Sequence, residues 1–498
     1  MIISGRPEEL TWCPASAGLE MRLLFQLPRT NVLRHFDSVV LALAEDGHDI
    51  TIATPGRSND WPLPEAVQSH PRVTCRTCPE AREDEWKDAA TDFRTIVDCG
   101  HYLESPFFEA EKLRDRAFRT LAQTLTGERS RHLAARCPSC GSKIVDGEFG
   151  GLRPALGDEA FRRLKILAML VEQAIPSDPG RERFLQDERP DVVLVSPLVR
   201  FGSEQADWVK SARALGIPVG FPVFSWDNLT TKGIVHVHPD RVFVWNAVQK
   251  REATEYYGIP PEQVVITGAP RFDSFLALSP SATRDEYCGR FSFDPAAPIV
   301  SYLCSSEFVA GHEVAFVEKW IERIRQDSQL GSCNILIRPH PRSVRQWADV
   351  DVTRFGRVAI AMSRVLNADQ SLYDALHHSA AVVGLNTSAQ IEAGILGKPV
   401  FTLLAQGFEH GQQGTLHFHY LLKEHGGFVE MARDLDEHLN HLAGALRGEV
   451  DVDGIRRAVE QFIRPHGWQQ PATPILAAAI CSLAPARSSA VRRWFSAR

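Results

Sequence analysis

The sequence predicts an α/β protein with two Rossmann-like domains, each a parallel sheet covered by helices. Nearly continuous apolar runs, such as residues 190–195 and 381–384, recur along the chain, as strands buried on both faces require. Helix-spaced apolar segments separate these runs, which is the pattern of β-α-β units. The length of 498 residues is too great for one hydrophobic core and indicates two domains, or three.

Composition and charge narrow the class of protein. The apolar fraction of 44% and the charged fraction of 23% are those of a soluble globular protein. The net charge of −7 argues against a nucleic-acid binder. The sequence shows no apolar run long enough to span a bilayer and no secretory signal, so a cytoplasmic protein is expected. The oligomeric state stays open.

The first domain is expected over residues 21–280, after an N-terminal extension of residues 1–20 that shows no periodicity. Its first β-α-β unit covers residues 21–53 and lacks the Gly-x-Gly-x-x-Gly turn, which argues against a dinucleotide site. Residues 80–187 are mostly polar with helical spacing and are interpreted as a helical insertion.

The second domain is expected over residues 297–465, after a proline-rich linker at 279–297. Its strands are predicted at 299–304, 334–338, 357–362, 381–384 and 399–403. Late helices close the domain, and residues 466–498 are expected to form a C-terminal tail. The apolar stretch 475–480 and the basic-aromatic stretch 491–495 could touch an anionic membrane, although a frayed end explains them equally well.

Two pairs of cysteines have the spacing of zinc ligands. Cys137 and Cys140 resemble half of a zinc knuckle, and Cys75 and Cys78 offer a second pair. The simpler interpretation of residues 73–78 is a strand that ends at Pro79. In a cytoplasmic protein all of these thiols are expected to be reduced.

Two strand-to-turn segments of the second domain carry the clearest functional pattern. The first turn, at 338–341, offers Arg338 and His340, the latter fixed between two prolines. The second offers Asn386, Thr387 and Ser388 at the start of a helix. Ligands bind at the carboxyl ends of strands in open α/β sheets, so these turns predict an anion site. A helix cap and a structural ion pair of the arginine are the alternative interpretations.

The same segments carry a resemblance to a known family. The Arg-Pro-His-Pro turn, the Asn-Thr-Ser turn and Gly-Lys-Pro at 397–399 are similar to motifs of bacterial transferases of surface polysaccharides. The most similar patterns belong to the CMP-sugar transferases of sialic acid and Kdo and to the CDP-glycerol glycerophosphotransferases. The resemblance implies the GT-B architecture, in which two Rossmann-like domains face each other across a cleft, with C-terminal helices. Leu-Asn-Thr-Ser at 385–388 differs from the glycerophosphotransferase Asp-Tyr-Ser-Ser and weighs against polyol-phosphate transfer.

The donor of such an enzyme is a nucleotide sugar, and CMP- or CDP-linked donors are favoured over UDP-linked ones by the resemblance alone. His340 is a candidate catalytic residue that binds phosphate or protonates the leaving group. Glu392 lies one helical turn after Ser388 and is suited to a ribose. The candidate donor-binding residues are Arg338, Asn386, Thr387, Ser388, Glu392, Ser305 and Ser306.

The first domain would hold the acceptor. The loop 224–233 follows a buried strand and mixes aromatic, acidic, amide, hydroxyl and basic side chains. Asp227 is the first candidate for the base that takes the acceptor proton, although an Asx-turn is the structural alternative. Further candidate substrate-binding residues are Trp226, Asn228, Lys232, Asp273, which is also a second candidate base, and His417. The sequence contains no Asp-x-Asp motif in a matching place, so a reaction without metal or other cofactor is expected.

The sequence therefore predicts a glycosyltransferase that acts on a polysaccharide or lipid-linked acceptor, with peripheral contact at the inner face of the membrane as a further expectation. Three alternatives stay open. One is polyol-phosphate transfer of the CDP-glycerol type. Another is a UDP-N-acetylglucosamine 2-epimerase-like enzyme, whose comparable turn reads Ser-Gly-Gly-x-x-Glu. The third is a non-catalytic scaffold that binds nucleotide sugars.

Overall fold

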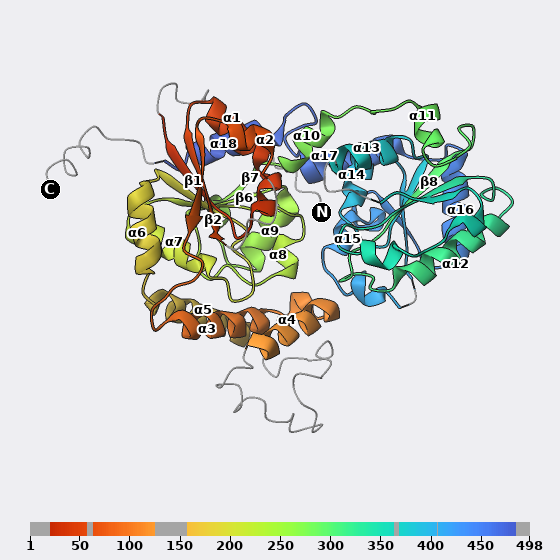
Figure 1. Ribbon diagram of the computed structural model, residues 1–498. Coiled ribbons are helices and arrows are strands. Elements are labelled where there is room, and N and C mark those ends of the chain that lie inside the picture. Colours follow the sequence, from red (N-terminus) through yellow and green to blue (C-terminus); the bar gives the residue numbers. More distant parts are fainter. Residues whose placement is uncertain (1–19, 57–62, 125–156, 363–367, 406, 485–498) are drawn as a thin grey trace.

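The protein folds into two α/β domains that lie side by side (Figure 1). The structure is a computed structural model, and it describes residues 20–56, 63–124, 157–362, 368–405 and 407–484. Cys137, Cys140 and the stretch 491–495 lie outside the described residues. No helix in the described part of the chain is long and apolar enough to cross a membrane.

The first sheet has seven parallel strands in the order β3-β2-β1-β4-β5-β6-β7. Its strands are β1 (Arg22–Gln26), β2 (Asp49–Pro55), β3 (Val73–Cys78), β4 (Val192–Val195), β5 (Val219–Pro222), β6 (Arg241–Val244) and β7 (Val264–Ile266). The strand order reverses between β1 and β4, which pair directly, with Phe25 opposite Leu194. Ligands bind at such a reversal, outside the carboxyl ends of the strands.

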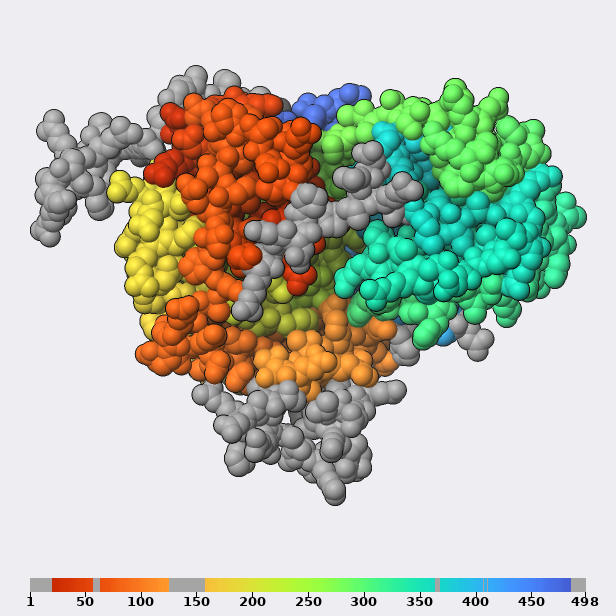
Figure 2. All heavy atoms as spheres, in the orientation of Figure 1, coloured from red at the N-terminus to blue at the C-terminus, as the bar shows by residue number. Residues whose placement is uncertain are grey.

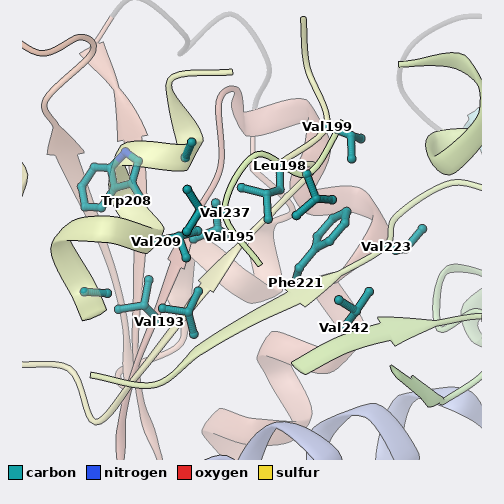
Figure 3. Close-up of a cluster of buried hydrophobic side chains, with 14 of the residues drawn as sticks. Val193, Val195, Leu198, Val199, Trp208, Val209, Phe221, Val223, Val237 and Val242 are labelled. Carbon is teal, nitrogen blue, oxygen red and sulfur yellow. The ribbon is translucent and has the colours of Figure 1, made fainter. Parts of the chain in front are cut away.

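The core of the first domain explains its apolar strands. Val193, Phe221 and Val242 come from three neighbouring strands and pack with Trp208 and Val209 of the covering helix α7 (Gln205–Ala214) (Figure 3). Both faces of β4 and β5 are buried along their whole length, and β6 is buried from Val242 onward, which explains the apolar residues of these strands.

The second sheet has six parallel strands in the order β10-β9-β8-β11-β12-β13. Its strands are β8 (Ile299–Leu303), β9 (Asn334–Arg338), β10 (Val358–Ile360), β11 (Ala381–Val383), β12 (Val400–Leu403) and β13 (Val429–Ala432). The pattern repeats that of the first sheet, with the reversal between β8 and β11. Five of these strands coincide with the predicted ones to within two residues at each end.

Helices cover both faces of the two sheets. In the first domain they are α1 (Asp37–Glu45), α2 (Glu65–Ser69), α3 (Lys87–His101), α4 (Glu111–Thr124), α5 (Asp158–Ala174), α6 (Pro179–Glu188), α7, α8 (Asn228–Thr231), α9 (Ala247–Glu255) and α10 (Arg271–Leu276). After α11 (Arg284–Gly289) follow α12 (Glu313–Gln326), α13 (Ala368–His377), α14 (Ala389–Ile395), α15 (Phe418–Leu421), α16 (Leu435–Leu446), α17 (Val452–Ile463) and α18 (Ala472–Cys481). The linker thus contains a short helix, α11, which begins with a capping box between Thr283 and Glu286.

Helices α3, α4 and α5 form a layer below the first sheet (Figure 1). A buried ion-pair network fixes this layer to the domain. Arg94 on α3 donates hydrogen bonds to Glu172 on α5 and to Asp207 on α7, at 2.7–2.9 Å. Each charge in this network is compensated, which is the condition under which buried charges are tolerated.

The end of the described chain returns to the first domain. Helix α17 packs on α14 of the second domain, and α18 packs on α1 of the first. Leu476 and Ile480 are buried in the core that α1 helps to form. The expectation that stretch 475–480 touches a membrane is therefore wrong, because the side chains that would enter a bilayer are buried inside the protein.

Strand β3 contains Cys75 and Cys78 and directs their side chains to opposite faces. Cys75 is exposed and Cys78 is buried, because residues three positions apart in a strand point to opposite faces. Burial raises the pKa of the Cys78 thiol to about 11, so this side chain stays a neutral thiol at neutral pH. The strand interpretation of residues 73–78 is confirmed, and the two side chains do not converge as zinc ligands would. Within the described ranges, no group of three or more His, Cys, Asp or Glu residues is arranged to hold a metal ion.

Candidate functional site

Trp226 of the first domain and His417 of the second are in direct ring contact. Their centroids are 4.8 Å apart and their planes are nearly perpendicular. Trp226 lies in the loop after β5, and His417 directly precedes α15. Both side chains are buried. The sequence analysis gave both residues as candidate substrate-binding residues, and the structure brings them into contact. Figure 2 shows the surface hollowed between the two domains.

Asp227, next to Trp226, is held by three neighbours. Ser225 donates a hydrogen bond to Oδ1 at 2.5 Å, Thr231 donates one to Oδ2 at 3.0 Å, and Lys232 Nζ lies 3.5 Å from Oδ2. Burial by itself would raise the pKa of Asp227, but Lys232, His417 and these hydroxyls outweigh it and lower the pKa well below its ordinary value. The carboxylate is therefore ionised at neutral pH.

The lysine beside it is a cation in a partly enclosed place. Lys232 Nζ lies 3.0 Å from the Thr231 hydroxyl, and burial lowers the pKa of this ammonium group. Asn228 supports the loop from within, since its Oδ1 accepts the backbone N–H groups of Phe224 and Ser225. Lys232 and Asp227 thus face the boundary between the domains, whereas Asn228 holds the turn that carries them.

Two further polar side chains at this boundary have unsatisfied nitrogen atoms. The guanidinium of Arg116 on α4 lies 4.8 Å from the ring centre of Phe308 in the second domain. Its Nε and Nη2 are buried and have no hydrogen-bond partner among the described residues. The same holds for Nδ1 of His417, whose pKa burial lowers to about 4, so the imidazole is neutral. Buried polar atoms are normally paired, so such atoms indicate a place for water or a ligand.

His340 is half-buried at the end of β9. Its Nδ1 accepts the backbone N–H of Arg342 at 3.1 Å, which places the ring proton on Nε2. Burial, followed by the charges of Arg342 and Arg34, lowers the pKa of His340 to about 4. At neutral pH this side chain is a neutral hydrogen-bond donor, and it is poorly suited to act as a general acid.

Arg338 and Asn386 are directed into the protein. Arg338 Nη1 donates hydrogen bonds to the carbonyl and the hydroxyl of Ser371 on α13, at 3.0 and 3.1 Å. Asn386 Nδ2 donates to the carbonyl of Gly411 at 2.9 Å and contacts the Thr415 hydroxyl at 3.3 Å. Neither contact is the structural alternative that the sequence offered: within the described residues Arg338 pairs with Ser371 and not with a carboxylate, and the Asn386 side chain contacts Gly411 and Thr415 and does not cap α14.

Ser305 and its neighbours form a supporting turn. Ser305 is fully buried, its N–H donates to Glu313 at 2.8 Å, and its hydroxyl accepts the N–H of Asn386 at 3.4 Å. The carbonyl of Ser306 accepts the N–H groups of Val309 and Ala310, as in an ordinary turn.

Thr387 is buried, and its N–H donates to Gln390, so one of the predicted anion-binding amides is already occupied. Ser388 is exposed at the start of α14 and makes no side-chain cap. Of the polar side chains in this turn, only Ser388 faces solvent, so the turn as a whole is less open than the sequence predicted.

The side chain of Glu392 contacts the first domain. Its Oε1 lies 3.5 Å from Arg271 on α10, while Oε2 is buried without a partner in the described part of the chain. Burial raises the pKa of Glu392 to about 7, against the opposing charge of Arg271. Asp273, two residues after that arginine, accepts hydrogen bonds from Arg464 and from the N–H of Thr473. Its carboxylate thus fixes the crossing between α17 and α18, and it is not free to act as a base.

Sequence reasoning missed Arg116 and Arg271. Arg116 lies on an amphipathic helix of the insertion, and Arg271 begins a short helix after β7. Neither helix carries a local motif, so only the packing of the two domains reveals that these side chains meet the site.

No family model matches the chain, and no curated protein matches its sequence. A solved glycosyltransferase from Rickettsia africae is 9% identical, with 94% of this chain and 100% of that chain covered and a TM-score of 0.50. A UDP-GlcNAc 2-epimerase from Neisseria meningitidis, bound to UDP-GlcNAc, is 13% identical, with 93% and 100% covered and a TM-score of 0.47. A Methanocaldococcus jannaschii UDP-GlcNAc 2-epimerase, in complex with UDP-GlcNAc and UDP, is 12% identical, with 93% and 99% covered and a TM-score of 0.46.

The likeness to the Rickettsia structure extends over the whole of that chain and nearly all of this one. Together with the two parallel sheets, it confirms the fold that the sequence predicted. The chain is an α/β protein with the GT-B architecture.

Proposed function

We propose that this protein is a GT-B glycosyltransferase that moves a sugar from a nucleotide-activated donor to a polysaccharide or lipid-linked acceptor. The observation that carries the proposal is the ionised Asp227 beside Lys232, in a loop of the first domain that contacts His417 of the second. A carboxylate, cations and unsatisfied polar atoms thus meet at one boundary between two domains. Glycosyl transfer between two bound substrates needs such an arrangement.

In the proposed reaction the first domain holds the acceptor and the second holds the donor. The acceptor hydroxyl gives its proton to Asp227, and its oxygen forms a bond to the anomeric carbon of the donor sugar. The bond from that carbon to the phosphate oxygen breaks, and the nucleotide leaves with the electron pair. Lys232 and Arg116 stabilise the charge that develops on the leaving phosphate, so the proposed step needs no metal.

The lowered pKa of Asp227 makes it a weak base in the absence of ligands. Lys232 contributes to this lowering, and it is also the cation that would pair with a donor phosphate. Sharing Lys232 with the phosphate would raise the pKa of Asp227 and make the carboxylate more basic. The base would therefore be activated only when the donor is bound, which limits wasteful hydrolysis.

On the donor side, we propose that His340 donates from Nε2 to the phosphate and that Ser388 contributes its exposed hydroxyl. Glu392 would accept hydrogen bonds from the ribose, in exchange for its contact with Arg271. The resemblance of the Arg-Pro-His-Pro turn favours a cytidine nucleotide. Cytidine compounds are therefore expected to bind more tightly than uridine compounds.

Contact with a membrane, where lipid-linked acceptors reside, would use α5. Leu164, Ile166, Leu167, Leu170 and Val171 on this helix are 43–57% exposed. Arg162 and Arg163 on the same helix are also exposed, although both pair with Glu159. An exposed apolar helix face with flanking basic residues is typical of proteins that bind the bilayer surface.

The proposal is tested by a thermal-shift screen of the whole protein with CMP, CDP, UDP, GDP and dTDP and their sugar derivatives. A ligand that binds only the folded state raises the melting temperature by mass action. If none of these compounds shifts it, the proposed donor site is wrong.

The positive compound is then incubated with and without saccharide acceptors, and the products are identified. Transfer to a hydroxyl supports the proposal. Interconversion of the donor sugar without an acceptor would indicate an epimerase, transfer of a polyol phosphate would indicate the CDP-glycerol type, and binding without turnover would indicate a scaffold.

A further inference from the structure

A cavity of about 520 Å³ lies in the first domain, apart from the loop that carries Asp227. Its wall includes Gln26 at the end of β1, Pro55 at the end of β2, and residues 200–205 after β4. It therefore occupies the carboxyl edge of the sheet where the strand order reverses, the place where open α/β sheets bind ligands. Its volume is that of a small-molecule site.

Two arginines in the wall form no ion pair with a described residue. The side chains of Arg29 and Arg200 form no hydrogen bond or ion pair with any residue that the structure describes. Burial and then the charge of Arg29 lower the pKa of Arg200, while the charge of Glu204 raises it, so Arg200 is repelled by Arg29 and attracted by Glu204. An anion between them would remove this repulsion and gain charge-assisted hydrogen bonds from both.

The wall also contains Glu80 and Glu204, and the charge of Glu204 acts on Arg200. Glu204 lies 3.9 Å from the fully buried Arg181, and burial raises the pKa of Glu204, which favours its neutral form. Arg181 is itself paired with Asp178. Arg29 and Arg200 are therefore the cations of the wall that form no ion pair with a described residue.

A buried hydroxyl supports a ligand at this place. Ser203 lines the cavity and is 3% exposed, and its Oγ has no hydrogen-bond partner within the described residues. The neighbouring Gln205 is rigidly held, since its Nε2 donates to Gln26 Oε1 at 2.6 Å and its Oε1 accepts the N–H of Leu198. The cavity thus presents an unsatisfied hydroxyl on a fixed floor, which is how a preformed polar site is built.

The cavity adjoins the site between the domains. Phe201 lines it, and the guanidinium of Arg116 lies 5.8 Å from the Phe201 ring centre and 4.8 Å from that of Phe308. One arginine thus connects the cavity wall to the second domain.

We propose that this cavity binds an anionic saccharide, through a carboxylate or phosphate group held by Arg29, Arg200 and Ser203. The inference rests on the proposed function, because it makes this saccharide the acceptor. It adds to that function a substrate class, an acceptor that carries a negative charge.

Isothermal titration of the whole protein with glucuronate, glucose 6-phosphate and neutral glucose tests the inference. The two charged sugars should bind more tightly than glucose, by tenfold or more, and the stronger of them identifies the anionic group. Arg29→Gln and Arg200→Gln should each weaken binding of the charged sugars by roughly tenfold, which corresponds to one charge-assisted hydrogen bond. Ser203→Ala should weaken it less. Arg183→Gln, an exposed arginine on α6, is the matched control and should leave binding unchanged.

Equal binding of charged and neutral sugars would overturn the inference, as would unchanged affinity in both arginine variants or no binding of any charged sugar. Nucleotide binding is measured on the same samples. If nucleotides bind and the charged sugars do not, only the acceptor inference fails. If no nucleotide binds, the proposed function fails, whatever the cavity does.

Discussion

Arg271 of the first domain and Glu392 of the second form an ion pair across the boundary between the domains, 3.5 Å apart. Arg271 also lies 3.3 Å from Asp369, which belongs to the second domain as well. The two acids therefore hold the start of α10 against α13 and α14. Any separation of the domains along this edge must break both pairs, so the pairs favour the closed arrangement.

Glu392→Gln should change the pH dependence of stability. The folded-state pKa of Glu392, about 7, lies above its ordinary value of 4.5, so folding favours the protonated form. This stabilisation is fully present below pH 4.5 and is lost as the pH rises through 7. Glutamine does not titrate, so the variant lacks this pH-dependent contribution. The free energy of unfolding of the variant minus that of the wild type should therefore rise by on the order of 2–3 kcal/mol between pH 5 and pH 8.

Urea unfolding at pH 5 and pH 8 measures this difference. A stability difference between wild type and Glu392→Gln that does not vary with pH would contradict the raised pKa.

Arg338→Met should lower stability without weakening nucleotide binding. The buried guanidinium supports α13 through Ser371, and its loss should cost about 1–3 kcal/mol. Melting temperature and nucleotide affinity, measured on the same samples, separate the two roles. Ser371→Ala removes only the hydroxyl contact and should cost less. A tenfold loss of nucleotide affinity with unchanged stability would restore Arg338 as a phosphate ligand.

Most strands were predictable because they are short apolar runs with a clear end. β9 is buried along its length and ends at Arg338, directly before Pro339. β3 is polar and partly exposed, and its end at Cys78, directly before Pro79, marked it instead. The fold class followed from the order of these runs and helices.

The roles of the polar residues at the strand ends were less predictable. Arg338 contacts Ser371, which lies 33 residues further along the chain, and Asn386 contacts Gly411. Whether such a side chain faces a ligand or a neighbouring loop depends on long-range packing, which leaves no local signal. The loop with Asp227 was predictable because it concentrates many functional groups that a structural loop rarely needs.

Asp227→Asn should reduce the transfer rate by about 10²–10⁴, while the affinity for the donor stays within a few-fold. The amide keeps the shape of the carboxylate but cannot take a proton. Rate and binding are measured separately, by single-turnover kinetics and by titration of the nucleotide sugar. Full activity in this variant would remove Asp227 as the base.

Ser225→Ala is a finer test of the same carboxylate. The Ser225 hydroxyl donates to Asp227 Oδ1 and helps to lower the pKa of Asp227. Without this bond that pKa rises, so the acidic limb of the rate profile should move to higher pH. If the acidic limb does not shift although the variant folds like the wild type, a group other than Asp227 determines the pH of that limb.

Arg116→Met should weaken donor binding or slow its turnover by roughly tenfold or more, as loss of one charge-assisted hydrogen bond implies. The substitution keeps most of the volume between Phe201 and Phe308 but removes the nitrogen atoms that lack partners. If those atoms serve only the packing of α4, the variant will lose stability and keep its kinetics. Arg119→Met, on the exposed side of the same helix, is the control.

The apolar face of α5 predicts where the protein would meet a bilayer. Leu167→Asp with Leu170→Asp should reduce cosedimentation with vesicles of anionic lipid at least tenfold, because two of the most exposed apolar side chains of the helix become charged. Both positions are more than half exposed, so the melting temperature should change little. Val452→Asp, at an exposed apolar position on α17, is the control for added charge. Equal cosedimentation of the double variant and the wild type would show that α5 is not the contact, and that lipid-linked acceptors reach the site by another route.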